Sequence, residues 1–285
     1  MRCLITGAGG MLGRALCRAL GERHEIVALA HADLDVADLT AVRAALARWV
    51  PDVVIHSAGW TDVDGCQQDP DRAFRVNGLG SRNVALGCQA SGAACCYIST
   101  DYVFDGAKAE PYTEFDLPNP ISVYGASKLA GERAVQAAAQ RHWIVRTSWL
   151  YGPGGRNFVR TILTRARAGA DLRVVDDQSG SPTYAPDLAQ AIARLIEEPR
   201  YGLWHLTNGQ SCTWYDFAAA ILENTGQTGA RLEPILSKDL DRPAPRPKNS
   251  ILRNYCWELE GWPLLRGWPD ALRDYLADPE LTGLD

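Results

Sequence analysis

The segment Leu4–Gly13 reads L-I-T-G-A-G-G-M-L-G and leads from a predicted strand, through a glycine turn, into a predicted helix. A dinucleotide-binding fingerprint requires this context. In that motif Gly7 permits the tight turn, Gly10 lets backbone amides approach a pyrophosphate, and Gly13 lets the helix pack closely on the strand. The spacing is G-x-x-G-x-x-G, because the stricter G-x-G-x-x-G would need glycine where Leu12 stands. A glycine turn without a ligand would look the same, so the motif alone leaves both interpretations open.

Around this segment, short apolar runs alternate with amphipathic segments through the first half of the chain. Crossovers of this length imply a parallel sheet with helices on both faces, so we predict a Rossmann-like, doubly wound α/β fold. The predicted strands are Arg2–Thr6, Glu25–Leu29, Asp52–Ser57, Ala94–Ser99 and Trp143–Ser148, and the predicted helices are Met11–Leu20, Asp38–Trp49, Pro70–Ala90 and Pro120–Arg141.

The second half has a different texture, since eleven of the 16 prolines follow residue 150. We expect a cofactor domain at 1–148 and a smaller C-terminal substrate-binding domain at 149–285, with some segments returning to the first sheet. Predicted helices there are Asn157–Gly169, Pro186–Glu197 and Trp214–Thr225, and the main loops are Asp176–Tyr184 and Pro243–Asn249. Such loops are expected to build a binding cleft rather than a second independent core.

Charge and composition narrow the class of partner. The net charge of −5 and the pI of about 5.6 argue against a nucleic-acid partner. No apolar run reaches the length of a membrane span, and the strand–turn–helix pattern directly after Met1 argues against a secretory signal. The eight cysteines form no C-x-x-C pair, so we expect no zinc site, reduced thiols and a cytoplasmic protein.

The second predicted strand bears on cofactor preference. NAD sites usually carry an acid at the end of this strand, but here no acid occurs before Asp33. A 2′-phosphate would meet no fixed repulsion and could be helped by His31. This favours NADPH, with NADH also possible. Asp35 and Val36 lie where the next loop could flank an adenine.

A tyrosine and a lysine, Tyr124 and Lys128, stand four residues apart on one face of a predicted helix. The pKa of a phenol is about 10, and a nearby ammonium would favour the phenolate, so the pair could transfer protons near neutral pH. A surface pair without function would have the same spacing. Thr100 follows the strand Ala94–Ser99, where a hydroxyl faces the ligand crevice. It could grip a carbonyl oxygen while the phenol delivers its proton.

The glycine loop, Thr100 and the Tyr-x-x-x-Lys pair together resemble the extended short-chain dehydrogenase/reductase superfamily. Further strings, collinear over almost the whole chain, resemble the dTDP-4-dehydrorhamnose reductase family. They are S-T-D-Y-V-F-D-G at Ser99–Gly106, R-T-S-W-L-Y-G at Arg146–Gly152, Asn157-Phe158, D-Q-S-G-S-P-T-Y-A-P-D-L-A at Asp177–Ala189, and Arg246-Pro247 with Asn249-Ser250.

The resemblance implies reduction of dTDP-4-dehydro-L-rhamnose to dTDP-L-rhamnose by hydride from NADPH or NADH. Thr100 would polarise the ketone, Tyr124 would donate the proton, and Lys128 would tune Tyr124 and bind the nicotinamide ribose. The implied cofactor-binding residues are Gly7, Gly10, Met11, Leu12, Asp35, Val36, Ala58, Gly59, Thr61, Tyr124 and Lys128, and the implied substrate-binding residues are Asp101, Tyr102, Trp149 and Arg246.

Other features carried by the resemblance concern support and assembly. Arg246 would clamp the nucleotide diphosphate, because a guanidinium matches phosphate geometry. Asn77 would support the backbone around the site. Mg2+ is used by some family members, but the sequence contains no ligand cluster that specifies a metal. A homodimer is possible.

The chain departs from the family pattern at two places, and several assignments keep alternatives. The family often has asparagine where this chain has His56, and Arg253 stands where an aspartate is common. Alternative functions are 4-keto reduction of another nucleotide deoxysugar, a non-catalytic NADP-binding regulatory subunit, and a sugar-nucleotide epimerase. Purely structural roles remain open for six residues: Asp101, Trp149, Tyr184, Asp187, His205 and Arg246.

Overall fold

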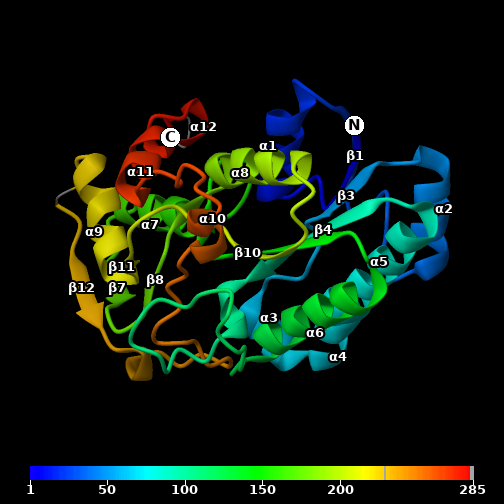
Figure 1. Cartoon of the computed structure of the whole chain (residues 1–285). Helices are drawn as coiled ribbons and strands as arrows, with labels where there is room; N and C mark the ends of the chain where they lie inside the picture. The colour runs from blue at the N-terminus through cyan, green and yellow to red at the C-terminus, as the bar shows by residue number, and fades with distance from the viewer. Residues whose placement is uncertain (228, 283–285) are drawn as a thin grey trace.

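The computed structural model describes residues 1–227 and 229–282, and its centre is a six-stranded parallel sheet (Figure 1). The strand order is β10-β5-β4-β3-β1-β2, and every pair is parallel. The bounds are β1 Arg2–Thr6, β2 Glu25–Leu29, β3 Val53–His56, β4 Ala94–Thr100, β5 His142–Thr147 and β10 Gly202–His205. The predicted doubly wound fold is therefore confirmed.

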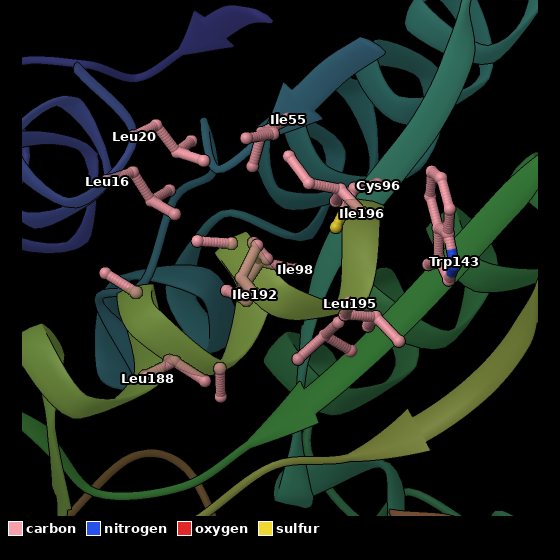
Figure 2. Packing of buried hydrophobic residues seen from close by; sticks show 14 of the residues in the cluster. Leu16, Leu20, Ile55, Cys96, Ile98, Trp143, Leu188, Ile192, Leu195 and Ile196 are labelled. Carbon is pink, nitrogen blue, oxygen red and sulfur yellow. The ribbon is translucent and has the colours of Figure 1, made fainter. Parts of the chain in front are cut away.

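Helices cover both faces of this sheet. Helices α1 (Met11–Gly21) and α8 (Ala185–Glu197) run side by side over one face, while α2 (Leu39–Trp49), α5 (Gly80–Ser91) and α6 (Val123–Ala138) cover the other (Figure 1). Figure 2 shows leucines and isoleucines of α1 and α8 meeting the apolar side chains of the strands. Each such side chain contributes about 1.5–3 kcal/mol by leaving water, so this contact anchors the glycine turn between β1 and α1.

Two second-half elements, α8 and β10, return to this sheet, as expected. The division of the chain near residue 148 stays a prediction.

The predicted helix Pro70–Ala90 is interrupted by an unusual turn. It consists of α4 (Pro70–Ala73), a π-helical turn η1 (Phe74–Leu79) and then α5. Such π-turns are rare and often occur at functional sites. A short helix not predicted from the sequence, α3 (Val63–Gln68), precedes this segment. The later helix α6 begins at Val123 rather than Pro120, because the Ser122 side chain caps it by accepting a hydrogen bond from Gly125 N.

The C-terminal half contains a second buried apolar cluster, where the sequence had favoured a binding cleft over a second independent core. Tyr151, Phe217 and Leu272 belong to one buried cluster, because the apolar faces of α7, α9 and α11 point toward each other. The remaining elements are η2 Asp101–Val103, β6 Leu150–Tyr151, α7 Phe158–Arg167, β7 Leu172–Val175, β8 Ser179–Gly180, β9 Thr183–Tyr184, β11 Cys212–Thr213, α9 Trp214–Asn224, β12 Leu232–Ile235, η3 Ser237–Asp239, α10 Tyr255–Leu259, α11 Trp268–Leu276 and α12 Pro279–Thr282.

Several smaller predictions concern single residues. All eight cysteines are free thiols. Asp187 is structural, since it pairs with Arg266 at 2.8 Å. His205 lies in the core, where Nδ1 is 3.2 Å from two backbone carbonyl oxygens, but Nε2 has no hydrogen-bond partner among the described residues. The prediction of a core histidine with its hydrogen bonds made is therefore right for the burial and for Nδ1, and wrong for Nε2. Within residues 1–227 and 229–282, no helix is both long and apolar enough to cross a membrane.

Candidate active site

The site forms where β4 ends and α6 begins, and Thr100 is its first polar group. Thr100 is the last residue of β4 and is buried. Its hydroxyl donates to Asp101 Oδ1 at 2.9 Å and accepts from Tyr102 N at 3.2 Å, which shapes the turn η2. A hydrogen bond also joins Thr100 to Tyr124. The structure thus brings together the threonine and the tyrosine that are 24 residues apart in the sequence.

Tyr124 lies in the first turn of α6, against η2. Its ring meets the Tyr102 ring edge to face at 5.7 Å, and only 9% of the residue is exposed. Gly125 makes this approach possible, because a Cβ there would lie 2.0 Å from the carbonyl oxygen of Tyr102. Burial raises the pKa of Tyr124, and the Asp101 carboxyl adds to the effect, while the Thr100 hydrogen bond opposes it.

That direction corrects the sequence argument, which expected an ammonium to favour the phenolate. In the structure, burial outweighs the other influences on Tyr124, so its phenol stays protonated at neutral pH. A protonated phenol is the form that a proton donor needs. Tyr124 is therefore in the protonation state that a proton donor requires.

Lys128 is buried behind Tyr124, with 5% of its surface exposed. Its ammonium donates to Ile98 O at 2.6 Å and lies 4.2 Å from the centre of the Tyr97 ring. Burial lowers the pKa of Lys128 to about 7, and the charge of Glu132 opposes this effect. The side chain therefore sits in a pocket where its charge is only weakly favoured.

The sequence left open whether Asp101 only stabilises a turn or also belongs to the site, and in the structure it is placed for both. Its Oδ1 accepts from Thr100, as a turn residue would, but Oδ2 is buried and has no hydrogen-bond partner among the described residues. Burial raises the pKa of Asp101 to about 7, against the effect of the hydroxyls of Ser250 and Thr100. A buried carboxyl oxygen of this kind can bind a hydroxyl of a ligand.

The glycine turn fits a dinucleotide pyrophosphate. Gly7 has φ +69°, and a Cβ there would lie 2.7 Å from Ala58 N, while a Cβ at Gly13 would lie 2.3 Å from Gly7 O. Helix α1 begins after Gly10 without a side-chain cap, so its first N–H groups are available to an anion. The side chain of Leu12 packs in the core, so any cofactor contact it makes is through its backbone.

Among the remaining predicted cofactor residues, Met11 lies in α1 and the others lie in the loops after β2 and β3. After β2, the Asp33 carboxylate accepts from Ala30 N, Asp35 accepts from Ala37 N, and Val36 packs against Gly80. Met11 lies in the first turn of α1, against Gly155.

The loop after β3 contains Ala58, Gly59, Trp60 and Thr61, and hydrogen bonds to the backbone of Trp60 hold it in place. Asn77 accepts from Trp60 N at 2.8 Å and donates to Trp60 O at 3.0 Å, which confirms its predicted supporting role. A Cβ at Gly59 would lie 3.7 Å from Lys128 Nζ, so this loop runs directly past the ammonium.

Two residues predicted to bind substrate already have partners. Arg246 forms a two-pronged ion pair with Asp64 of α3, at 2.8 and 2.7 Å, and also bonds to Tyr102. Trp149 stacks on Trp214 at 3.5 Å and has an unusual φ of +45° for a residue with a side chain. Backbone strain of this kind is concentrated at functional sites. Asp64 and Trp214 were missed, because no sequence signal links them to their partners.

A buried ion pair behind Lys128 was also missed. Glu132 stands one helical turn after Lys128 and pairs with Arg146 at 2.9 and 2.7 Å, while Ser99 donates to the same carboxylate at 2.5 Å. The Glu132 and Arg146 residues are each 2% exposed. The helical spacing Lys128–Glu132 was available as a signal. The described part of the chain contains no group of three or more His, Cys, Asp or Glu residues that could hold a metal ion.

Comparison with known proteins shows which family the chain resembles. The family model described as RmlD substrate binding domain matches residues 1–280. A dTDP-4-dehydrorhamnose reductase of Streptomyces griseus is 43% identical, over 99% of this chain and 94% of the relative. A probable dTDP-4,6-dihydroxy-2-methyloxan-3-one 4-ketoreductase of Streptomyces antibioticus is 42% identical, over 98% and 95%. The crystal structure of dTDP-4-dehydrorhamnose reductase from Bacillus anthracis in complex with NADP has a TM-score of 0.94 and 39% identity, over 96% of this chain and 98% of that one.

Proposed function

Because the chain belongs to the dTDP-4-dehydrorhamnose reductase family, it is an NAD(P)H-dependent oxidoreductase, and we propose that it reduces dTDP-4-dehydro-L-rhamnose to dTDP-L-rhamnose. The observation that carries the proposal is the convergence of Thr100, Tyr124 and Lys128 at the end of β4, next to the glycine turn. NADPH is the proposed cofactor, since the Bacillus anthracis relative was crystallised with NADP.

Ketone reduction adds a hydride to the carbonyl carbon and a proton to the oxygen. The reduced nicotinamide supplies the hydride when it is bound. Tyr124 is the proposed proton donor, since burial keeps its phenol protonated. Thr100 donates a second hydrogen bond to the same oxygen, which requires its hydroxyl to turn from Asp101 Oδ1 to the substrate. Two donors on one oxygen stabilise the negative charge that develops there.

We propose two roles for Lys128, one toward the ribose of the cofactor and one toward Tyr124. Its Nζ lies beside Gly59, so a ribose hydroxyl bound over this loop would find an ammonium donor. The same charge stabilises the phenolate that Tyr124 becomes after it has given up its proton. Deprotonation of Lys128 near its pKa of about 7 would remove both contributions.

The sugar nucleotide is proposed to lie between the end of β4 and the loop of Arg246. Asp101 Oδ2 and the Trp149 ring would face the sugar. Arg246 would contribute to diphosphate binding, although Asp64 occupies its guanidinium fork and a phosphate would have to share or displace this carboxylate. Met11, Leu12 and the loops after β2 and β3 would contact the dinucleotide.

A test of the reaction is the variant Tyr124→Phe, which removes only the phenolic hydroxyl. We expect kcat to fall by at least about 10², in line with general acid catalysis, while NADPH still binds. Turnover is followed as loss of nicotinamide absorbance with dTDP-4-dehydro-L-rhamnose. A variant with near-normal kcat would remove Tyr124 from the mechanism.

A second candidate substrate is the 4-keto group of another dTDP-deoxysugar. The Streptomyces antibioticus relative, named as a 4-ketoreductase of such a sugar, is as similar to this chain as the Streptomyces griseus reductase. A panel of dTDP-4-keto sugars compared by kcat/KM separates the two. Reduction of another member of the panel, without oxidation of NADPH on dTDP-4-dehydro-L-rhamnose, would assign the second function.

A further inference from the structure

The buried histidine at the end of β3 joins the elements that carry the cofactor loops. His56 is fully buried, and its ring stacks on the Tyr97 ring at 5.5 Å. Its Nδ1 lies 2.8 Å from Thr6 Oγ1, and its Nε2 lies 3.1 Å from Ser81 Oγ. Thr6 ends β1 directly before Gly7, and Ser81 lies in the first turn of α5. One imidazole therefore connects β1, β3 and α5.

The hydrogen bonds of this group run in a single direction. Ser81 Oγ donates to Asn77 O at 2.6 Å, because a carbonyl can only accept. Its hydrogen is then in use, so Ser81 accepts from His56 Nε2–H. Burial lowers the pKa of His56 to about 3, so the ring is neutral and has a single N–H. Nδ1 must therefore accept from the Thr6 hydroxyl, and the order is Thr6 to His56 to Ser81 to Asn77.

Beyond Asn77 the network reaches the reacting groups. Asn77 lies in the π-turn η1, and its side chain holds both the N–H and the carbonyl of Trp60, in the loop after β3. The same amide nitrogen donates to Ser127 Oγ at 3.0 Å, and Ser127 donates to Tyr124 O at 2.8 Å. The backbone of the proposed proton donor is thus tied to the loop that passes Lys128.

A second set of bonds ties the β1 end to the same loop. Ser57 Oγ donates to Thr6 O at 2.7 Å, and Ala58 N approaches Thr6 Oγ1 at 3.4 Å. The next residues along these two segments, Gly7 after Thr6 and Ala58 after Ser57, pack closely against each other. Thr6 and His56 therefore stand at the base of both loops that are proposed to enclose the dinucleotide.

We propose that His56 is a positioning residue, whose imidazole holds the glycine turn and the loop 57–62 in register with Asn77 and Tyr124, so that NADPH binds in line with the proton donor. The inference rests on the proposed function for the identity of the cofactor and for the role of Tyr124 as proton donor. A 1 Å displacement in such a site can lower the rate by about 10², and a buried group left unpaired weakens a site by about tenfold or more.

The test compares His56→Ala with His56→Asn in the full chain. Alanine removes both hydrogen bonds, whereas asparagine keeps one donor and one acceptor. We expect His56→Ala to raise the Kd of NADPH and to lower kcat, each by at least about tenfold, and His56→Asn to restore both to within about threefold of wild type. The Kd comes from fluorescence titration with NADPH alone, and kcat comes from turnover of the preferred keto sugar.

The matched control is His205→Asn. His205 is also fully buried and neutral, because burial lowers its pKa to about 3, but its Nδ1 bonds to backbone carbonyls near β10. This variant should lower Tm and leave the Kd of NADPH within about twofold, which separates positioning from a general loss of stability.

Two results would overturn the inference. One is an unchanged Kd and kcat in His56→Ala, and the other is an Asn variant as impaired as the Ala variant, which would leave only ring packing on Tyr97. If His56→Ala does not fold, Ser81→Ala is measured instead, because it removes the hydroxyl that accepts the hydrogen bond from His56. A wild-type Kd and kcat in Ser81→Ala would overturn the inference equally. Since the Kd measurement needs no sugar, a wrong substrate assignment would leave this test intact.

Discussion

Replacing Lys128 by methionine should abolish turnover and yet stabilise the protein. Methionine has nearly the length of lysine without its ammonium, and the site is 5% exposed. The variant therefore removes a charge that burial disfavours while it preserves most of the packing. Most changes in a buried site destabilise a protein, so a gain in stability is a stringent expectation.

The magnitude follows from the position of the Lys128 side chain. Burial lowers its pKa from 10.5 to about 7, and a difference of this size corresponds to about 5 kcal/mol at neutral pH. The variant would also leave Ile98 O without the hydrogen bond that it accepts from Lys128 at 2.6 Å, which costs about 1–3 kcal/mol. We expect Lys128→Met to raise the free energy of unfolding by about 2–4 kcal/mol at pH 7.

The lowered pKa of Lys128 also predicts how the stability difference between Lys128→Met and wild type changes with pH. As the pH rises from the folded-state pKa of about 7 toward 10, the folded protein loses the proton on Lys128, whereas the unfolded chain keeps it. Stability rises with pH wherever the unfolded state binds more protons, here by about 1.4 kcal/mol per pH unit. Methionine does not titrate, so the amount by which the free energy of unfolding of Lys128→Met exceeds that of wild type should shrink steadily between pH 7 and 9. Groups that titrate in both proteins cancel in the difference.

Urea unfolding followed by tryptophan fluorescence at pH 7, 8 and 9 measures this difference. Lys108→Met is the matched control, since Lys108 is partly exposed and pairs with Asp116 at 2.8 Å. Its loss should change the free energy of unfolding by at most about 1 kcal/mol, without a trend across this range. A Lys128→Met variant that is less stable than wild type at pH 7, or whose advantage stays constant to pH 9, would refute the reasoning.

Two further predictions concern packing beside the site. Glu132→Gln should lower the free energy of unfolding by about 3–5 kcal/mol, because it leaves Arg146 buried without a counter-ion; urea unfolding should show that adding Arg146→Met recovers part of this loss. Gly125→Ala should cost about 1–3 kcal/mol or more and lower kcat, since its Cβ would lie 2.0 Å from Tyr102 O. Gly21→Ala, with its nearest atom at 3.9 Å, should be neutral or stabilising by the same measurement.

The fold was predictable because its signals are local. Each strand of the first half is a short apolar run, and the alternation with helices admits few arrangements other than a parallel sheet. The glycine turn was readable from its spacing, and the close approach of Gly13 to Gly7 and Ala8 lies within the motif, whereas the approach of Gly7 to Ala58 involves a distant loop. Thr100 could be placed at the ligand crevice because it follows a parallel strand, and the four-residue spacing placed Tyr124 and Lys128 on one helix face. The family resemblance then grouped the three.

What could not be predicted depends on contacts between distant segments. The Asp64–Arg246 pair joins residues 182 apart, and neither has a spacing that signals the other. The second core was missed for the same reason: α7 and α9 were predicted as separate helices, α11 was not predicted, and nothing in the sequence indicates that the three meet. The pKa of Tyr124 had the wrong predicted direction because the sequence gives charge spacing but not burial, and burial dominates here.

These errors have a common physical origin that also explains the site. Around the end of β4, burial disfavours the charged forms of Asp101, Tyr124 and Lys128 at once, and Asp101 Oδ2 lacks a partner among the described residues. A fold selected for stability alone would replace such groups by apolar ones. Their retention makes sense if a ligand supplies the missing partners: a carbonyl oxygen for Tyr124 and hydroxyls for Asp101 and Lys128. Binding of cofactor and sugar should therefore relieve the same unfavourable burial that the Lys128→Met variant is designed to measure.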